Sequence, residues 1–222
     1  NTALEQLMQQ KEIKLVKEFT GLDQWYFILK KYSETALSQF EYWEKQTLPY
    51  NMMKQWSNTS DNGIVGENIF KQTTLDAEVV ELLENNLEAD KFSIVEVILT
   101  ALFKAMNNIY KINEIPIILE SHGRECSASN NDLSRTVGWF TAMYPVRFEF
   151  SNVSDRLKML DEVHMGLKRV PDGGIGYGVL KFMLKKISDN NRYIRFNYLG
   201  SIRSNYENGI IKKVIPDMDG NV

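Results

Sequence analysis

Apolar residues recur at three- and four-residue spacing along several stretches of the chain, the spacing of one face of an α-helix. In residues 22–46, Trp25, Tyr32 and Phe40 follow this spacing with Lys, Glu and Gln between them. We interpret this aromatic stripe as core. The expected helices are residues 2–16 (a short helix and a lysine-containing connector), 22–46, 77–87 after Asp76, 94–110 after Ser93, 154–169 after Ser154, and 179–187.

Two of these helices carry further expectations. Ser93 and Glu96 form a capping-box pattern, and the helix that follows is apolar on most sides, so we expect it at the centre of the fold. In the helix at 154–169 we expect His164 to be a partly exposed structural residue. The side chains expected to face inward there are Leu157, Leu160, Val163 and Leu167.

Strand-like segments alternate with the helices. Residues 115–119 form a short apolar run, residues 141–150 alternate between the two faces, and residues 67–75 and 193–199 are also strand-like. Pro145 indicates a strand edge or a bulge because proline cannot donate to a central ladder. Residues 49–66 are polar and predict an exposed loop. Helices mixed with strands predict the α/β or α+β class.

Composition narrows the functional classes. The chain has 222 residues, a net charge of −3 and one cysteine, Cys126. Basic residues are not concentrated in any stretch, which argues against nucleic-acid binding, and there is no run of about eighteen apolar residues to suggest a membrane span. A single cysteine excludes an internal disulfide framework and favours a cytoplasmic location. The first residues resemble neither a translation start nor a signal peptide, which is typical of a piece of a longer polypeptide.

Charged residues gather where the strand at 115–119 ends. Glu120, His122 and Arg124 lie within five residues, and Gly123 allows a tight turn. Burial raises the pKa of a carboxyl group, so a carboxylate here could act as a general acid or base. The alternative is a structural ion pair from Glu120 to Arg124 or Arg135, and residue types alone favour that ion pair.

Other site chemistry has little support in the sequence. Two separated histidines and one cysteine predict no metal site. The glycine-rich turn at 171–178 has no preceding strand and no Gly-Lys-Ser/Thr, so we do not expect a nucleotide site. Its glycines would let a helix pack closely or a ligand chain pass. A Cys126–His122 nucleophile pair is a remote alternative.

Four stretches carry a family resemblance. They are residues 120–125 (E-S-H-G-R-E), 135–145 (R-T-V-G-W-F-T-A-M-Y-P), 171–178 (P-D-G-G-I-G-Y-G) and 196–200 (F-N-Y-L-G). Their order and spacing resemble those of the epimerization domains of nonribosomal peptide synthetases, within the condensation-domain superfamily. The resemblance runs from about residue 23 to residue 200. Ser121 stands where the family motif has glycine.

The resemblance implies a fold and a domain organisation. Domains of this superfamily resemble chloramphenicol acetyltransferase, with two lobes around a tunnel, and their N-terminal lobe carries H-H-x-x-x-D-G. That motif is absent here, since His122 and His164 are the two histidines of the chain. Residues 1–222 therefore resemble a single C-terminal lobe, a mixed sheet with packed helices, which we expect to be inactive without its N-terminal lobe.

The resemblance also implies a reaction, L-to-D inversion at the α-carbon of an aminoacyl or peptidyl thioester. The acyl group would ride on the 4′-phosphopantetheine of a peptidyl carrier domain, with no cofactor bound directly and with adenylation and condensation domains as neighbours. The implied catalytic residues are Glu120 as acid/base, with Asn197 and Tyr198 near the enolate oxygen. The implied substrate-binding residues are Arg135, His122, Gly176 and Tyr177, although packing is the simpler role for Tyr177.

Two other functions remain open. A condensation domain would form a peptide bond between two carrier-bound substrates, and a non-catalytic lobe would dock carrier or tailoring proteins. The amino-acid sequences of the stretches at 135–145 and 196–200 favour epimerization over condensation. Substitution of Glu120 separates an enzyme from a docking lobe.

Overall fold

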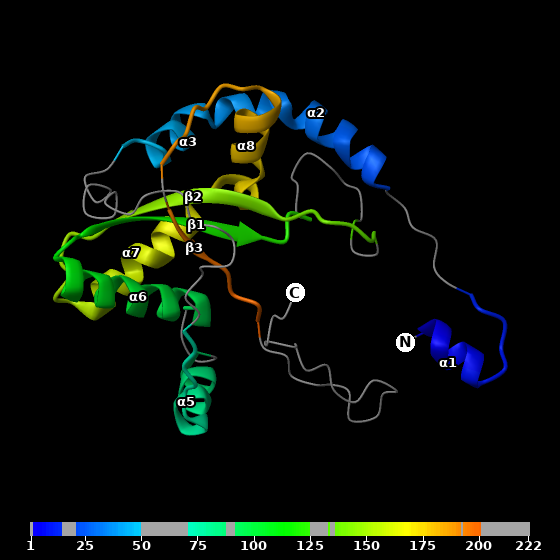
Figure 1. The fold of residues 1–222 in the computed structure, drawn as a ribbon, viewed down its shortest axis with the longest axis horizontal. Helices are drawn as coiled ribbons and strands as arrows, with labels where there is room; N and C mark the ends of the chain where they lie inside the picture. Colours follow the sequence, from blue (N-terminus) through cyan, green and yellow to red (C-terminus); the bar gives the residue numbers. More distant parts are fainter. Residues whose placement is uncertain are drawn as a thin grey trace.

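The computed structural model describes residues 2–14, 21–49, 71–87, 92–124, 133, 136–191 and 193–200. A small sheet lies at the centre of the described part of the fold. In the view of Figure 1, α2, α3 and α8 lie on one side of the strands and α6 and α7 on the other. The α-helices are α1 (Thr2–Met8), α2 (Leu22–Ser38), α3 (Phe40–Gln46), α5 (Ala77–Leu87), α6 (Ile94–Tyr110), α7 (Arg156–Lys168) and α8 (Ile175–Gly178). The 3₁₀ turn η1 (Pro171–Gly174) precedes α8, and the π-helical turn η2 (Val179–Met183) follows it.

The sheet has the strand order β2-β1-β3 in the described part of the chain. Its strands are β1 (Glu114–Ser121), β2 (Ala142–Glu149) and β3 (Ile194–Phe196). β2 runs antiparallel to β1 and β3 runs parallel to it, which confirms a mixed sheet. Pro145 lies on β2, an edge strand of this sheet, as its missing N–H group predicts.

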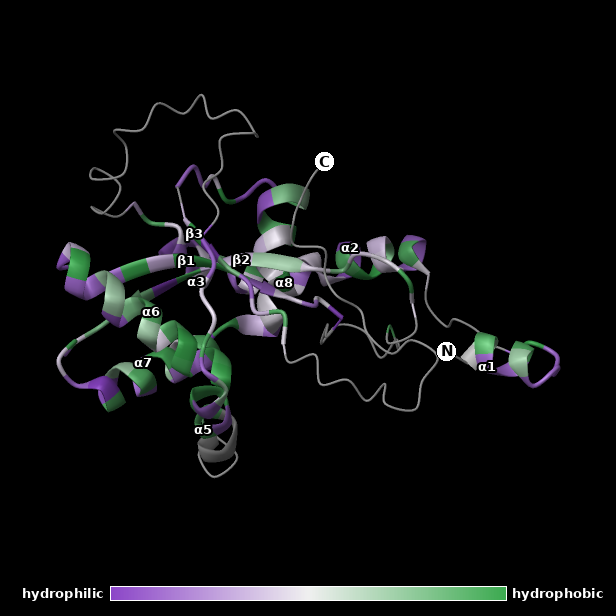
Figure 2. Ribbon diagram, turned by 60° about the horizontal axis from the view of Figure 1, so that its bottom comes forward, coloured by the Kyte–Doolittle hydropathy of each residue, from purple (hydrophilic) through white to green (hydrophobic). Residues whose placement is uncertain are grey.

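The core lies on one face of the sheet. Ile115, Ile117 and Leu119 of β1 are buried, and their cross-strand partners on β2 include Phe148 and Val146. Phe148 packs against Phe103 of α6 with ring centroids 4.8 Å apart, so α6 covers this face. The aromatic stripe of α2 and α3 is core as expected, since Trp25, Tyr32 and Trp43 are buried. In Figure 2 hydrophobic and hydrophilic residues alternate along α2, as in an amphipathic helix.

The capping box at the start of α6 is confirmed. The Ser93 side chain accepts from the Glu96 N–H, and the Glu96 carboxylate accepts from the Ser93 N–H at 2.6 Å. α6 contributes to the core as expected, but only one of its sides is fully buried. Leu99, Phe103 and Met106 form one buried stripe, whereas Val95 and Leu102 beside it are half-buried and Ile109 and Tyr110 near the end of the helix are exposed.

The helix expected over residues 22–46 is two helices. The first helix ends before Gln39, which has φ −94° and ψ 2°. The Gln39 side chain forms hydrogen bonds with Tyr32, Trp43 and Asp172. These tertiary hydrogen bonds explain a break that contains neither glycine nor proline. Glycine and proline are the residues from which a sequence predicts such a break.

The later helices also differ from expectation at their ends. Asp155, rather than Ser154, caps α7, accepting from the Lys158 N–H at 3.1 Å. Leu157 is 73% exposed because the inward stripe of α7 is formed by Met159 and Val163. The helix expected at 179–187 begins earlier, at Ile175, and ends in a π-helical turn at Met183.

Residues 71–75 do not form the strand expected over 67–75. They are exposed and have no strand partner, since no element of the described sheet reaches them. The rest of that expected strand, and residues 50–66 of the expected loop, lie outside the described residues. α5 begins and ends as predicted, yet Val79, Val80 and Leu82 are exposed, and α1 and α5 lie apart from the strands in Figures 1 and 2.

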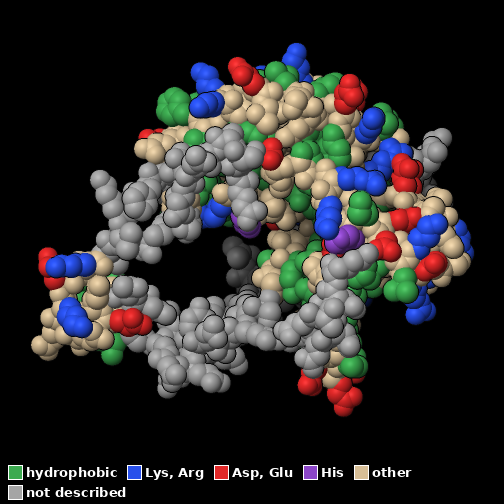
Figure 3. Space-filling model, turned by 180° about the vertical axis from the view of Figure 1, so that it is seen from behind, with side chains coloured by type: hydrophobic (Ala, Val, Ile, Leu, Met, Phe, Trp, Pro, Cys, Tyr) green, Lys and Arg blue, Asp and Glu red, His purple; other side chains and the backbone are tan. Residues whose placement is uncertain are grey.

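Charged side chains of both signs are interspersed on the face seen in Figure 3, consistent with the absence of a basic stretch in the sequence. Within the described ranges, no helix is long and apolar enough to cross a bilayer.

Candidate active site at the end of β1

Glu120 is the seventh residue of β1 and one of its carboxylate oxygens accepts a hydrogen bond from the side chain of Asn197. The Asn197 Nδ2 to Glu120 Oε2 distance is 3.0 Å, and the Glu120 side chain is 18% exposed. Its other oxygen lies 4.0 Å from Arg195 Nε. Because Arg195 is 67% exposed, this ion pair adds little attraction. The carboxylate is thus held in one orientation while part of it still faces solvent.

The register of the sheet explains this pairing. β3 runs parallel to β1 with Ile118 beside Arg195 and Leu119 beside Phe196, so the next residue, Asn197, falls beside Glu120. Side chains alternate between faces along a strand. Asn197 therefore shares a face with Glu120, whereas Phe196 packs on the core side. Tyr198 follows on the opposite face, is 36% exposed, and has no hydrogen bond to Glu120 in the described part of the chain.

Arg124 was considered as an ion-pair partner of Glu120, but its guanidinium makes other contacts. Its guanidinium donates to the carbonyl oxygens of Leu133, Thr136 (2.9 Å) and Gly138 (3.3 Å) and lies 4.4 Å from the centre of the Phe140 ring. A planar guanidinium with five N–H groups suits several carbonyls at once. Arg124 thus braces the loop that leads into β2, and the ion pair with Glu120 does not form.

His122 is exposed at the start of the same turn. Its Nδ1 accepts from the Arg124 N–H at 3.1 Å, and it lines a pocket of about 440 Å³ with Val137 and Trp139. Gly123 has φ +65°, and a Cβ there would lie 1.7 Å from the Phe140 carbonyl oxygen, so the turn requires glycine. Arg135 and Cys126, named from the sequence, lie outside the described residues.

Ser121 ties the end of β1 to the glycine-rich turn. Its hydroxyl donates to the Gly173 carbonyl oxygen at 2.7 Å. The neighbouring Asp172 has φ +46°, and its carboxylate accepts from Tyr32 at 2.5 Å and from Gln39 at 3.0 Å. The position at which the sequence departs from the family motif therefore gains a contact, and a chain of hydrogen bonds connects α2 to the residue beside Glu120.

Gly176 and Tyr177 lie in the packed layer between α8 and α3. A Cβ at Gly176 would lie 2.0 Å from Gln39 Oε1, and the Tyr177 ring packs against Trp43 with centroids 5.7 Å apart. No contact joins either residue to Glu120 in the described part of the chain. Close packing at Gly176 agrees with one of the two roles considered for the glycines of this turn.

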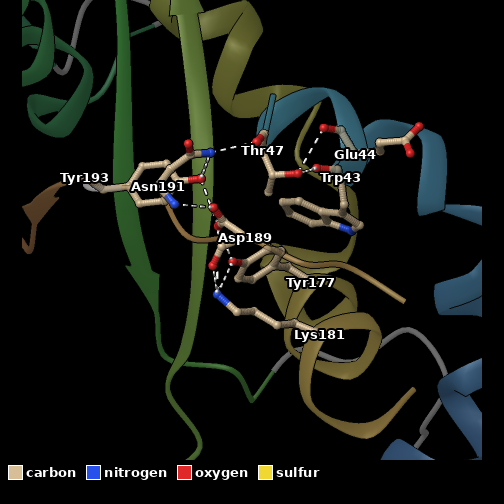
Figure 4. A network of polar contacts seen from close by, with 8 residues as sticks. All are labelled: Trp43, Glu44, Thr47, Tyr177, Lys181, Asp189, Asn191 and Tyr193. Carbon is tan, nitrogen blue, oxygen red and sulfur yellow. Dashed lines mark hydrogen bonds and ion pairs between the residues drawn. The ribbon is translucent and has the colours of Figure 1, made fainter. Parts of the chain in front are cut away.

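A polar network around Asp189, which sequence patterns did not indicate, anchors the segment between η2 and β3. The buried Asp189 carboxylate accepts from the hydroxyls of Tyr177 (2.7 Å) and Tyr193 (2.9 Å), and Lys181 Nζ lies 3.9 Å away. Asn191 donates to the Thr47 carbonyl oxygen at 2.6 Å, and Figure 4 shows Asn191 and Tyr193 in front of the strands. Burial, followed by the hydrogen bond to Asp189, raises the pKa of Tyr177 above its ordinary value.

His164 is a structural residue, but it is buried rather than partly exposed. Its Nδ1 lies 2.8 Å from Glu96 Oε1, and its ring meets Phe92 edge-on. The pair joins α7 to the first turn of α6, which explains why a histidine is buried on an otherwise apolar face. No group of three or more potential metal ligands gathers in the described part of the chain.

Comparisons with known proteins agree with this fold. The model of the condensation-domain family matches residues 5–214. This chain belongs to the condensation-domain family. Bacitracin synthase 2 of Bacillus licheniformis is 38% identical to it over 128 residues, which are 56% of this chain and 5% of the synthase.

Two solved structures show the same fold. The epimerization domain from the third module of tyrocidine synthetase B has a TM-score of 0.62 at 26% identity, over 82% of this chain and 41% of that chain. The first condensation domain of the CDA synthetase has a TM-score of 0.59 at 14% identity, over 89% of this chain and 42% of that one. The fold is therefore the chloramphenicol-acetyltransferase-like fold of these domains, and the chain spans less than half of each solved chain and 5% of bacitracin synthase 2.

Proposed function

We propose that this chain is the C-terminal lobe of an epimerization domain that inverts the α-carbon of an aminoacyl or peptidyl thioester carried by a peptidyl carrier domain. The observation that carries the proposal is the Glu120 carboxylate at the end of β1, oriented by Asn197 and partly open to solvent. The family to which the chain belongs acts within nonribosomal peptide synthetases, and the E-S-H-G-R-E wording around Glu120 resembles its epimerization members.

In the proposed reaction Glu120 takes the α-proton, and the C–H electron pair moves into the thioester to give an enolate. Return of a proton to the opposite face of the α-carbon gives the inverted thioester. This exchange requires a second acid/base on the other side, which we assign to the N-terminal lobe of the two-lobed domain. The phosphopantetheine thiol belongs to the carrier domain, so this lobe binds no cofactor of its own.

The residues around Glu120 take different roles in this proposal. Asn197 orients the carboxylate through its amide N–H. Tyr198 was the other residue expected near the enolate oxygen, but it follows on the opposite face from Glu120, so the proposal gives the contact with the carboxylate to Asn197 alone of this pair. The family resemblance assigns substrate binding to His122 and Arg135. Arg124 and Ser121 hold the surrounding loop and the glycine-rich turn in place.

Condensation is the alternative function within the family. Epimerization is favoured because identity is 26% with the tyrocidine epimerization domain and 14% with the CDA condensation domain. The sequence R-T-V-G-W-F-T at 135–141 also favours epimerization. A condensation domain would elongate a peptide and would not require Glu120 to exchange a proton.

The test is α-proton exchange in deuterated buffer by the intact two-lobed protein on an aminoacyl carrier domain, with mass spectrometry as readout. Glu120→Gln keeps the shape and the hydrogen-bonding site but removes the base, so we expect exchange to fall by more than about a hundredfold. Glu149→Gln, an exposed carboxylate at the other end of the same sheet face, is the matched control. Peptide elongation without exchange would support condensation, and unchanged exchange in Glu120→Gln would exclude the proposed role.

A further inference from the structure

An apolar pocket of about 460 Å³ opens at the edge of β2, close to Glu120. Its walls come from α2, from the residues leading into β2, and from α8 and η2. The side chains that matter for its chemistry are Trp25, Leu29, Trp139, Met143, Phe182 and Met183. The volume lies within the range of sites that bind small ligands, about 300–1,000 Å³.

The register places this pocket one side chain away from the proposed base. Met143, which lines the pocket, is the direct cross-strand partner of Glu120. Directly opposed residues of an antiparallel pair lie on the same face with Cβ atoms about 5 Å apart. Since β2 is an edge strand of the described sheet, a substrate whose α-carbon is at the Glu120 carboxylate can extend its side chain past Met143 and around this edge into the pocket.

The pocket has a fixed back wall and an adaptable rim. At the back, Trp25 meets Phe140 edge-on with centroids 5.6 Å apart, and both are buried. At the rim, Trp139 is 87% exposed and Phe182 is 70% exposed. Methionine side chains such as Met143 fit ligands of different shape because they are unbranched and flexible.

The lining selects the chemistry of the occupant. Apart from the two tryptophan indoles, Thr141 has the only polar side chain among the described residues that line the pocket. A phosphopantetheine arm or a peptide backbone carries amide groups that would lose their hydrogen bonds to water there. A hydrocarbon side chain has no such groups, and its burial against aromatic and methionine side chains is favourable.

We propose that this pocket is a specificity subsite that receives a bulky apolar side chain, aromatic or branched aliphatic, of the residue whose α-carbon faces Glu120. The inference rests on the proposed function for its setting. It adds that the epimerizing lobe itself discriminates among acyl groups by the size and polarity of the side chain.

Gly178 offers a direct way to fill the pocket. It lines the pocket, and a Cβ built on it meets no atom within 4 Å. Gly178→Leu therefore starts its side chain in open space at the lining of the pocket. Phe182→Ser removes one aromatic side chain of the rim at a position that is 70% exposed. Phe27→Ser is the matched control, because Phe27 is 64% exposed on α2 and is not among the lining residues.

The experiment measures kcat/KM for α-proton exchange by the intact protein on carrier domains loaded with phenylalanine or with alanine. The parent is expected to prefer phenylalanine at least tenfold, and Gly178→Leu and Phe182→Ser to lower that preference by about tenfold, the scale of apolar-pocket discrimination. Phe27→Ser should keep the parent's ratio. A ratio unchanged in the two pocket variants, or an equal loss on both acyl groups, would overturn the proposal.

A binding measurement separates this proposal from the proposed function. The probes are the phenylalanyl and alanyl amides of aminopantetheine, which cannot react, titrated calorimetrically into the intact protein. If the parent shows no exchange on any carrier, the epimerase assignment fails, but tighter binding of the phenylalanyl amide that Gly178→Leu weakens would still support the subsite. Equal binding of both amides by the parent would reject it.

Discussion

Two features determine the surroundings of Glu120, its position at the end of a strand and its hydrogen-bonding partner. Its place at a strand end was predictable, since an apolar run followed by a cluster of charged residues indicates where β1 stops. Its hydrogen-bonding partner was not predictable from spacing, because Asn197 lies 77 residues away along the chain. The two side chains meet because β3 pairs in parallel with β1 in one particular register.

This contact leads to a prediction about rate. Asn197→Ala removes the amide that orients Glu120, and a hydrogen bond to a charged group contributes about 1.5–3 kcal/mol. We expect kcat for α-proton exchange in the intact protein to fall about 10- to 100-fold with KM nearly unchanged, because Asn197 contacts the carboxylate rather than the carrier-bound group. Asn108→Ala, on the exposed side of α6, is the control. A rise in KM with unchanged kcat would assign Asn197 to substrate binding instead.

At the scale of elements, the glycine-rich turn and α8 show how close packing uses particular glycines. Gly174 has φ +87°, and a Cβ there would lie 1.8 Å from the Tyr144 ring. Gly176 has an ordinary helical conformation but faces Gln39, whereas Gly178 faces open space. These glycines look alike in the sequence, and only the neighbours of each one decide what it contributes.

The difference between two of these glycines can be measured. Gly176→Ala forces a methyl group toward Gln39 and Trp43, and overpacking of this kind costs about 1–3 kcal/mol. Gly178→Ala adds a methyl group without a collision and reduces the entropy of the unfolded chain, so it should be neutral or stabilising by up to about 1 kcal/mol. Urea unfolding of the intact protein, followed by tryptophan fluorescence, compares them. Equal destabilisation by both substitutions would contradict the packing role of Gly176.

At the scale of the whole molecule, the half-buried Tyr42 and the buried Tyr177 make stability depend on alkaline pH. Burial is the main cause that raises the pKa of Tyr42 from 10.0 to about 12, and it also raises the pKa of Tyr177. Below pH 10 these phenols are protonated in both the folded and the unfolded chain. Between pH 10 and 12 the unfolded chain releases their protons while the folded chain retains them, so the free energy of unfolding falls as pH rises.

Tyr42→Phe tests this dependence. It removes a phenol that has no hydrogen bond to lose in the described structure, so we expect little change in the free energy of unfolding at pH 8 and a shallower fall between pH 10 and 11. Tyr26→Phe, at a position 56% exposed on α2, provides the comparison. Urea unfolding at several pH values gives both slopes, and identical slopes for parent and Tyr42→Phe would refute the assignment.

The sequence by itself determined the elements whose signals are local. The capping box predicted the start of α6, Asp76 and an apolar stripe predicted α5, and the order of four motifs predicted the family. These succeed because hydrogen bonds within one turn, and the alternation or periodicity of apolar residues, depend on neighbours in the chain.

The tertiary structure decided everything that depends on residues distant in sequence. It broke the helix at Gln39, left Leu157 exposed, buried His164 against Glu96 and directed Arg124 to carbonyl groups rather than to Glu120. In each case, the elements that pack together determine which partner a polar side chain contacts and which face of a helix stays exposed. Sequence periodicity shows that a helix or strand has an apolar face, but only the packed fold determines the partner of that face and so the surroundings of the proposed catalytic carboxylate.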